Sequence, residues 1–267
     1  MGKQPWQIAM FQRSLKKKQK FRTLARFLPD MADKKCLDIT CGDNTGAMNY
    51  YFRQRGGDWV SADLEPKNLN SMKQLLQTGV LQLQETKFCF PDNIFDCVVV
   101  IDVLEHIRDP EPFLNELYRI TKPDGRVIVT VPNGDQNLLA NKLKRWIGMT
   151  PEKYGHIRAG FTLKDLSEIV ERGGFSVVNG GGYSKVFTEL VELAINASYV
   201  LVMNKNQEEN YGTIAPTEYS DLKTHGLSYK LYSLAYPLLR AFSSLDQLLF
   251  LGDYYAVVVE GIKDKGD

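Results

Sequence analysis

Residues 36–46, Cys-Leu-Asp-Ile-Thr-Cys-Gly-Asp-Asn-Thr-Gly, join a short apolar run to a turn that contains two glycines. The apolar run predicts a buried strand that carries Asp38 toward one edge of a sheet. Gly42 and Gly46 let the backbone turn tightly beside a ligand, and we expect a helix near 45–55 to follow. The turn lacks the Gly-x-Gly-x-x-Gly spacing of dinucleotide-binding proteins. It therefore predicts an α/β unit, but the turn alone does not identify a ligand.

Strands and helices alternate after this turn. We predict strands near 59–62, 80–84, 95–101, 127–131, 175–178 and 254–262, and helices near 66–77, 111–121, 135–147 and 163–172. The run at 95–101 is nearly continuous in apolar residues, which is typical of a central parallel strand buried on both faces. A turn is expected at 123–125, Pro-Asp-Gly. The repeated order predicts right-handed crossovers and a doubly wound parallel sheet.

Residues 6–28 form a basic segment with apolar residues at near-helical spacing, and Pro29 should end it. The apolar positions are Trp6, Phe11, Leu15, Phe21, Leu24, Phe27 and Leu28, with Lys16, Lys17, Lys18, Lys20, Arg22 and Arg26 between them. We interpret this segment as an amphipathic helical arm.

Residues 183–253 interrupt the alternation before the last strand. Two apolar helices are predicted near 186–203 and 228–250, with a polar loop at 204–224 between them, and Pro237 should kink the second helix. Three charged residues argue against a membrane-spanning helix: Lys230, Arg240 and Asp246. We interpret the insertion as a cap over the ligand site. Its apolar surface has three alternative roles: packing on the core, a homodimer interface, or contact with a lipid-like ligand or membrane surface.

Composition limits the function classes. The 267 residues carry a formal net charge of +1, so no global field favours nucleic acid. The four cysteines lack Cys-x-x-Cys spacing, which argues against a zinc knuckle and fits buried thiols in a reducing cytosol: Cys36, Cys41, Cys89 and Cys97. The N-terminus lacks the apolar stretch of a signal peptide, so we expect a cytoplasmic protein.

The second predicted strand ends near Asp63, about two dozen residues after Asp38. A carboxylate at that place can accept hydrogen bonds from both hydroxyls of a ribose. The alternative is a helix N-cap before Leu64-Glu65-Pro66.

Several segments, in order, resemble the class I S-adenosylmethionine-dependent methyltransferases. Residues 36–42 resemble the first motif of the class, Leu-Asp-hydrophobic-Gly-Cys-Gly, with Thr40 in place of the usual glycine. Further matches are Phe-Pro-Asp-Asn-Ile-Phe-Asp-Cys-Val-Val at 90–99, Leu-Glu-His at 104–106, Lys-Pro-Asp-Gly at 122–125, Val-Pro-Asn at 131–133, and His156 with Phe161, Thr162, Leu166, Gly174 and Phe175. The resemblance covers about 35–180 and the final strand. It implies a mostly parallel seven-stranded sheet with an antiparallel last strand and the helical insertion before it.

The sequence pattern and the resemblance together divide the chain, although the arm and the insertion lie outside the motifs of the family. Residues 1–34 would be the N-terminal arm and 35–182 the Rossmann-like domain that binds S-adenosylmethionine. Residues 183–253 would be the cap, and 254–267 the last strand and tail.

The resemblance assigns roles to individual residues. Asp38 and the turn around Gly42 would hold the methionine end, Asp63 the ribose, and Asp102 would lie beside the sulfonium. Leu64 would pack near the adenine, with Glu85 or Thr86 facing its amino group and Gln84 as a competitor. The remaining assigned cofactor contacts are Thr40, Cys41, Asn44 and Gly46, and the acceptor contacts are Asn133 and His156.

Methyl transfer depends mainly on in-line positioning, because the sulfonium already carries a good leaving group. An oxygen or nitrogen acceptor also needs its proton removed. The candidate bases are Asp102, His106 and His156. The alternative is that His106 ties a helix to the sheet and that His156 is a loop residue.

The run Asp102-x-x-Glu105-His106 also resembles the Glu-x-x-Glu-His segment with which some methyltransferases hold Mg²⁺, and His156 could complete that set. The same run is frequent in relatives without metal. We therefore predict no metal site.

The sequence predicts methyl transfer to an oxygen or nitrogen atom of a small-molecule, lipid-linked or glycan acceptor. The alternatives are an RNA methyltransferase, suggested by the basic residues between 142 and 158, and a catalytically silent protein that binds S-adenosylmethionine. Near-neutral charge and the lack of an RNA-binding module argue against RNA. A nicotinamide oxidoreductase is disfavoured because the third glycine is missing.

Overall fold

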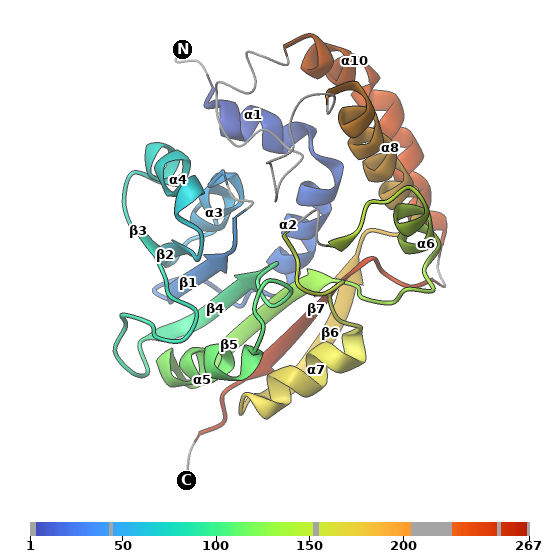
Figure 1. Ribbon diagram of the computed structural model, residues 1–267. Coiled ribbons are helices and arrows are strands. Elements are labelled where there is room, and N and C mark those ends of the chain that lie inside the picture. Colours follow the sequence, from blue (N-terminus) through green and yellow to red (C-terminus); the bar gives the residue numbers. More distant parts are fainter. Residues whose placement is uncertain (1–3, 43–44, 152–154, 204–225, 250–251, 266–267) are drawn as a thin grey trace.

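The computed structural model describes residues 4–42, 45–151, 155–203, 226–249 and 252–265 (Figure 1). Its centre is a seven-stranded sheet with the strand order β3-β2-β1-β4-β5-β7-β6. The strands are β1 (Lys35–Thr40), β2 (Asp58–Asp63), β3 (Val80–Gln82), β4 (Phe95–Ile101), β5 (Thr121–Pro132), β6 (Ser176–Tyr183) and β7 (Ala256–Ile262). Strand β7 runs antiparallel to both β5 and β6, whereas the pairs among β1 to β5 are parallel. The predicted fold class is confirmed.

Three strand boundaries differ from the sequence prediction. Strand β3 ends at Gln82 rather than near 84, and β5 begins at Thr121 rather than after the expected turn. The turn predicted at 123–125 lies inside β5, where the pairing with β4 is irregular, and Asp124 has a φ of 60°. Strand β6 runs on to Tyr183 because Gly180, Gly181 and Gly182 pair with β7. Glycine has low strand propensity, so only tertiary pairing extends this strand.

Helices cover both faces of the sheet (Figure 1). Helices α5 (Pro110–Ile120) and α7 (Leu163–Arg172) cover one face, where Phe113, Leu117 and Leu166 are buried. Helix α3 (Ala47–Arg53) packs on the other face through Phe52, which stacks on Trp59 with ring centroids 5.2 Å apart. The remaining core helices are α4 (Leu69–Leu76), after the 3-10 turn η1 (Pro66–Asn68), and α6 (Leu139–Trp146).

The basic N-terminal segment forms two helices rather than one, α1 (Trp6–Arg13) and α2 (Leu15–Phe27). Ser14 separates them because its backbone is extended and its hydroxyl caps α2, accepting from the Lys17 amide at 3.3 Å. Leu24 of α2 is fully buried beside Phe52. The apolar stripe of α2 therefore packs on the sheet and directs lysines of the same helix toward its neighbours.

The insertion contains α8 (Val186–Met203), α10 (Gly226–Ser243) and the 3-10 turn η3 (Ser244–Leu248), with α8 and α10 side by side (Figure 1). The predicted polar loop at 204–224 lies outside the described residues. Helix α10 contacts the N-terminal helices, since the Tyr236 hydroxyl donates to the Gln12 carbonyl at 3.2 Å. Its other face stays exposed, with Leu234 79% and Leu238 76% accessible. Thus one face of α10 packs on the protein and the other is unpartnered within the described residues.

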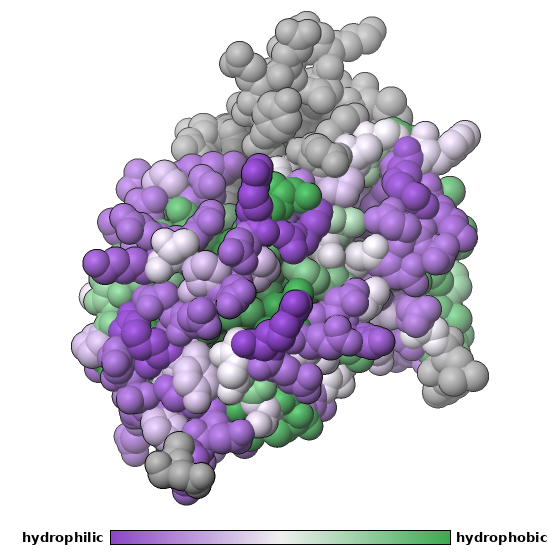
Figure 2. All heavy atoms as spheres, turned by 60° about the horizontal axis from the view of Figure 1, so that its bottom comes forward, coloured by the Kyte–Doolittle hydropathy of each residue, from purple (hydrophilic) through white to green (hydrophobic). Residues whose placement is uncertain are grey.

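Within the described ranges, no helix combines the length and apolar character needed to cross a membrane. Figure 2 shows that the face at the bottom of Figure 1 is mostly hydrophilic, with apolar residues in smaller patches.

Candidate active site

The candidate site lies at the carboxyl edge of β2, β1 and β4. Thr40 is in register with Asp63 of β2 and with Ile101 of β4, so three strands end together. The connections after β1 and β4 leave toward opposite faces, which makes this point a topological switch. Open α/β sheets bind ligands at that point.

The Asp63 carboxylate organises the glycine turn. It accepts from the Thr40 hydroxyl at 2.7 Å and from the backbone amides of Gly42 at 3.0 Å and Glu65 at 2.8 Å. Asp63 is buried, and desolvation raises the pKa of its carboxyl although these donors oppose the shift. The predicted N-cap alternative is wrong, because Glu65 occupies the N-cap position of η1.

The turn itself requires glycine. Gly42 and Gly46 have φ of 77° and 84°. A Cβ on Gly46 would approach the Cα of Met72 to 3.1 Å, so the turn and α4 come too close for a larger residue. Asn44 lies outside the described residues. The backbone of Leu64 is anchored by its amide, which donates to the Thr40 carbonyl at 3.0 Å.

Asp38 lies in β1, just before the carboxyl end of the strand, and is fully buried. Its carboxylate accepts from Ser61 of β2 at 2.9 Å and from the Asn49 side-chain amide of α3. Burial raises the pKa of Asp38 to about 7, against the lowering effects of Ser61, Arg53 and Asn49. Asp38 therefore ties β1, β2 and α3 together, and its predicted contact with the methionine end stays a prediction.

The expected adenine contacts lie farther from the sheet than predicted. Since β3 ends at Gln82, Glu85 and Thr86 occupy an exposed turn closed by the bridge between Gln84 and Lys87. Cys41 is half-buried, and burial raises the pKa of its thiol.

Asp102 follows β4 directly, and its backbone is held in the left-handed region at φ 50°. Its amide donates to the Thr130 carbonyl at 2.9 Å. Its carboxylate forms an ion pair with the Lys20 ammonium of α2. Asp102 is partly exposed, at 32% of its side chain, so it is available to a ligand at the switch point.

A compact cluster of three side chains adjoins Asp102. Glu105, His106 and His156 each offer a ligand atom, and all of these atoms lie within 4.8 Å of one another. Glu105 is fully buried, and neither carboxylate oxygen has a hydrogen-bond partner in the described part of the chain. Desolvation and the nearby Asp102 raise its pKa well above the usual range.

The two histidines contact each other edge to face, with ring centroids 4.6 Å apart. His106 Nδ1 lies 3.1 Å from the Gly155 carbonyl oxygen, which favours a proton on that nitrogen. Burial lowers the pKa of His156 to about 4, and His106 adds to the effect. His156 is therefore neutral near pH 7. The described residues would admit a cation in this cluster, and the absence of a metal stays a prediction.

Asn133 follows β5 directly, and its side chain makes hydrogen bonds within the fold. Its side-chain amide donates to the Tyr254 carbonyl at 2.7 Å, and its oxygen accepts from the Asp135 amide at 2.9 Å. Both polar ends of the side chain thus have partners, and its predicted contact with the acceptor stays untested.

Comparison with known proteins agrees with this geometry. Residues 11–179 match the model of a family described as a methyltransferase domain. The chain belongs to this methyltransferase family. A demethylmenaquinone methyltransferase of Streptomyces avermitilis is 28% identical over 174 residues, which are 59% of this chain and 74% of that enzyme. A demethylmenaquinone methyltransferase of Thermus thermophilus is 30% identical over 105 residues, which are 38% of this chain and 48% of that enzyme. The chain therefore matches about half the length of the Thermus relative.

A solved S-adenosylmethionine-dependent methyltransferase from Mesorhizobium loti shares the fold. The TM-score is 0.56 at 13% identity, and the match covers 91% of this chain and 97% of that one. The class I assignment of the methyltransferase is thereby supported at the level of sequence family and of fold.

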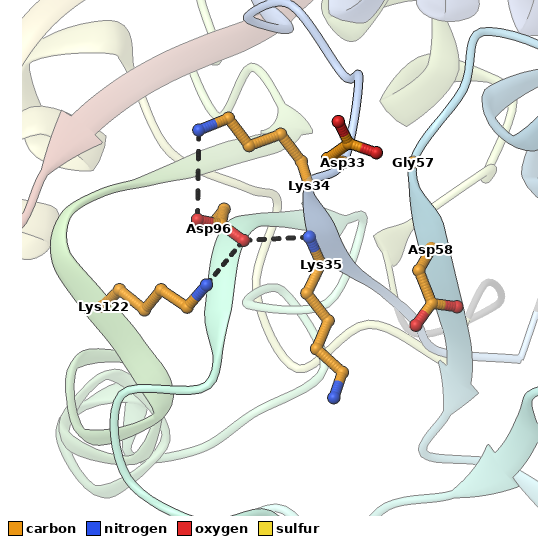
Figure 3. Close-up of a pocket in the computed structure, with 7 residues that line it drawn as sticks. All are labelled: Asp33, Lys34, Lys35, Gly57, Asp58, Asp96 and Lys122. Atoms are coloured by element: carbon orange, nitrogen blue, oxygen red, sulfur yellow. Dashed lines mark hydrogen bonds and ion pairs between the residues drawn. The ribbon is translucent and has the colours of Figure 1, made fainter.

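The methyltransferase also has a charged hollow at the opposite edge of the sheet (Figure 3). Its central group is Asp96, which accepts from the Lys35 amide at 2.9 Å and from Lys122 Nζ at 2.8 Å. The hollow is lined by Asp33, Lys34, Lys35, Gly57, Asp58, Asp96 and Lys122. It lies at the amino ends of β1 and β2, where doubly wound sheets do not bind their ligands, so the methyltransferase site is assigned to the carboxyl edge.

Two residues of the candidate site escaped the sequence analysis. Lys20 reaches Asp102 from α2, and no local pattern links positions 82 residues apart. Glu65 is exposed, and its Cγ would lie 3.4 Å from a Cβ placed on Gly42. Glu65 could have been found from the sequence as a second acidic residue shortly after Asp63, the last residue of β2.

Proposed function

We propose that the protein transfers a methyl group from S-adenosylmethionine to an oxygen or nitrogen atom of a small-molecule, lipid or glycan acceptor. The carrying observation is the cluster of Glu105, His106 and His156, which adjoins Asp102 at the switch point. Both relatives are demethylmenaquinone methyltransferases by name, which supports a quinone-like small molecule as the acceptor of this chain.

The residues at the edge fit the cofactor. The glycine turn gives close access to the backbone, and the exposed Glu65 carboxylate beside it can accept from ribose hydroxyls. Asp102 is a partly exposed carboxylate at the switch point, and a carboxylate there suits a neighbouring positive charge. S-adenosylmethionine, when bound, supplies an activated methyl group on a sulfonium.

The protein's own groups orient the acceptor and take its proton. The imidazole of His156 is the proposed proton acceptor, and His106 is oriented by the Gly155 carbonyl. Glu105, Val103 and Leu104 beside these residues are fully buried, whereas the two histidines are half-buried. The proposal thus assigns His156 as the base and His106 as the residue that positions it.

The test combines binding and turnover. Calorimetry should show S-adenosylmethionine and S-adenosylhomocysteine binding to the wild-type chain and weaker binding to Glu65→Ala. Transfer of a radiolabelled methyl group is then measured on quinols, phenols, amines and sugars. His156→Gln should lose most of the turnover and keep cofactor binding. Absence of cofactor binding would reject the assignment, and full turnover in His156→Gln would remove the proposed base.

A further inference from the structure

Lys20 holds the carboxylate that faces the switch point. Its ammonium forms an ion pair with Asp102, and only 12% of the Lys20 side chain is exposed. Helix α2 keeps this lysine inside because Leu24, one turn later, is fully buried on the sheet. The pair is therefore fixed by packing and is not a loose surface contact.

If S-adenosylmethionine binds as proposed, its sulfonium would lie beside Asp102, where the Lys20 ammonium lies. A ribose held near β2 leaves the rest of the cofactor to extend toward the switch point between β1 and β4, where Asp102 lies. Two cations cannot both sit against one carboxylate without repulsion, which at an effective dielectric constant of about 20 is substantial over a few ångströms.

We infer that Lys20 competes with the sulfonium for Asp102, so that the site senses the charge difference between S-adenosylmethionine and S-adenosylhomocysteine. This inference rests on the proposed function. Lys20 is a positioning residue in this scheme, because it acts through Asp102.

The carboxyl group of Glu105 lies next to the pair. Glu105 is fully buried, and both of its oxygens have no hydrogen-bond partner in the described segments. Lys20 and Asp102 both act on it electrostatically.

Methyl transfer removes the positive charge that competes with Lys20 for Asp102. The bond between methyl carbon and sulfur breaks with both electrons staying on sulfur, and the acceptor's lone pair forms the new bond while its proton passes to the base. The cationic sulfonium becomes a neutral thioether, and Asp102 is again free to pair with Lys20. The Lys20–Asp102 pair thus weakens the binding of S-adenosylmethionine, whose sulfur is cationic, but not the binding of S-adenosylhomocysteine, whose sulfur is neutral.

The experiment compares binding of the two cofactors by calorimetry in the wild-type chain and in Lys20→Met. Lys20→Met should raise the affinity ratio of S-adenosylmethionine to S-adenosylhomocysteine about tenfold. Lys20→Arg keeps the charge and should stay near the wild-type ratio. Arg22→Met, which removes an exposed charge from the same helix, is the matched control and should stay within about twofold.

An unchanged ratio in Lys20→Met would overturn the inference, as would equal weakening of both cofactors, which a merely structural role predicts. Should Lys20→Met not fold, Lys20→Gln replaces it. In the Asp102→Asn background the Lys20 substitution should no longer change the ratio, and a persisting change would also overturn the inference. If neither cofactor bound the wild-type chain, the proposed function itself would fail.

Discussion

Glu189 of α8 offers a sharp test of how the insertion is attached. Its carboxylate is fully buried between Lys16 of α2, at 2.5 Å, and Lys144 of α6, at 2.8 Å. The Ser184 hydroxyl donates to it at 2.7 Å. Replacing it in Glu189→Gln leaves two largely buried ammonium groups without their shared anion.

The magnitude follows from the pKa. Burial alone would raise the pKa of Glu189, but Lys16 and Lys144 outweigh it and lower the value from 4.5 to about 2. A shift of that size corresponds to about 3 kcal/mol of folding free energy. Because the folded pKa is depressed, this contribution is complete above pH 4.5 and is lost as the pH falls toward 2. Breaking a buried pair on one side costs about 3 to 5 kcal/mol.

Urea unfolding followed by circular dichroism gives the free energy of unfolding at pH 7 and at pH 3. Glu189→Gln should be destabilised by about 3 to 5 kcal/mol at pH 7 and by clearly less at pH 3. Glu168→Gln removes an exposed pair with Lys164, 3.8 Å long, and should cost at most about 1 kcal/mol. A loss below about 1 kcal/mol in Glu189→Gln, or one that does not change with pH, would refute the reasoning.

Three further outcomes are expected. Asp63→Ala should weaken S-adenosylmethionine binding by about 1 to 3 kcal/mol in calorimetry, because the turn loses its anchor and the ribose a partner; unchanged affinity would remove Asp63 from the site. The rate of methyl transfer should show no His156 titration between pH 5 and 8, since the pKa of His156 is about 4; a limb in the wild-type profile that vanishes in His156→Gln would contradict this. Activity should survive EDTA, and a loss restored by a divalent cation would instead assign Glu105 and the histidines as ligands.

The sequence predicted the fold well where periodicity was strong and less well where tertiary contacts decide. The apolar run at 95–101 became β4, and the Asp38 turn became the β1–α3 connection. The glycines at 180–182 hid the second half of β6, because their strand structure comes only from pairing with β7. The side chains of the site were harder still, since Asp38 and Asn133 carry plausible polar groups that the fold uses for its own hydrogen bonds.

The N-terminal helices matter to the chemistry because of where their lysines end. Lys16 pairs with Glu189 of the insertion, and Lys20, one helical turn later, pairs with Asp102 of the site. Helix α2 is therefore a rigid link between the insertion and the carboxyl edge of the sheet. A movement of Lys20 away from Asp102 takes place one turn from the anchor at Glu189, so the side chain can move while the helix stays fixed. This arrangement accounts for how a basic segment far from the glycine turn in sequence can tune the charge of the site without rearranging the fold.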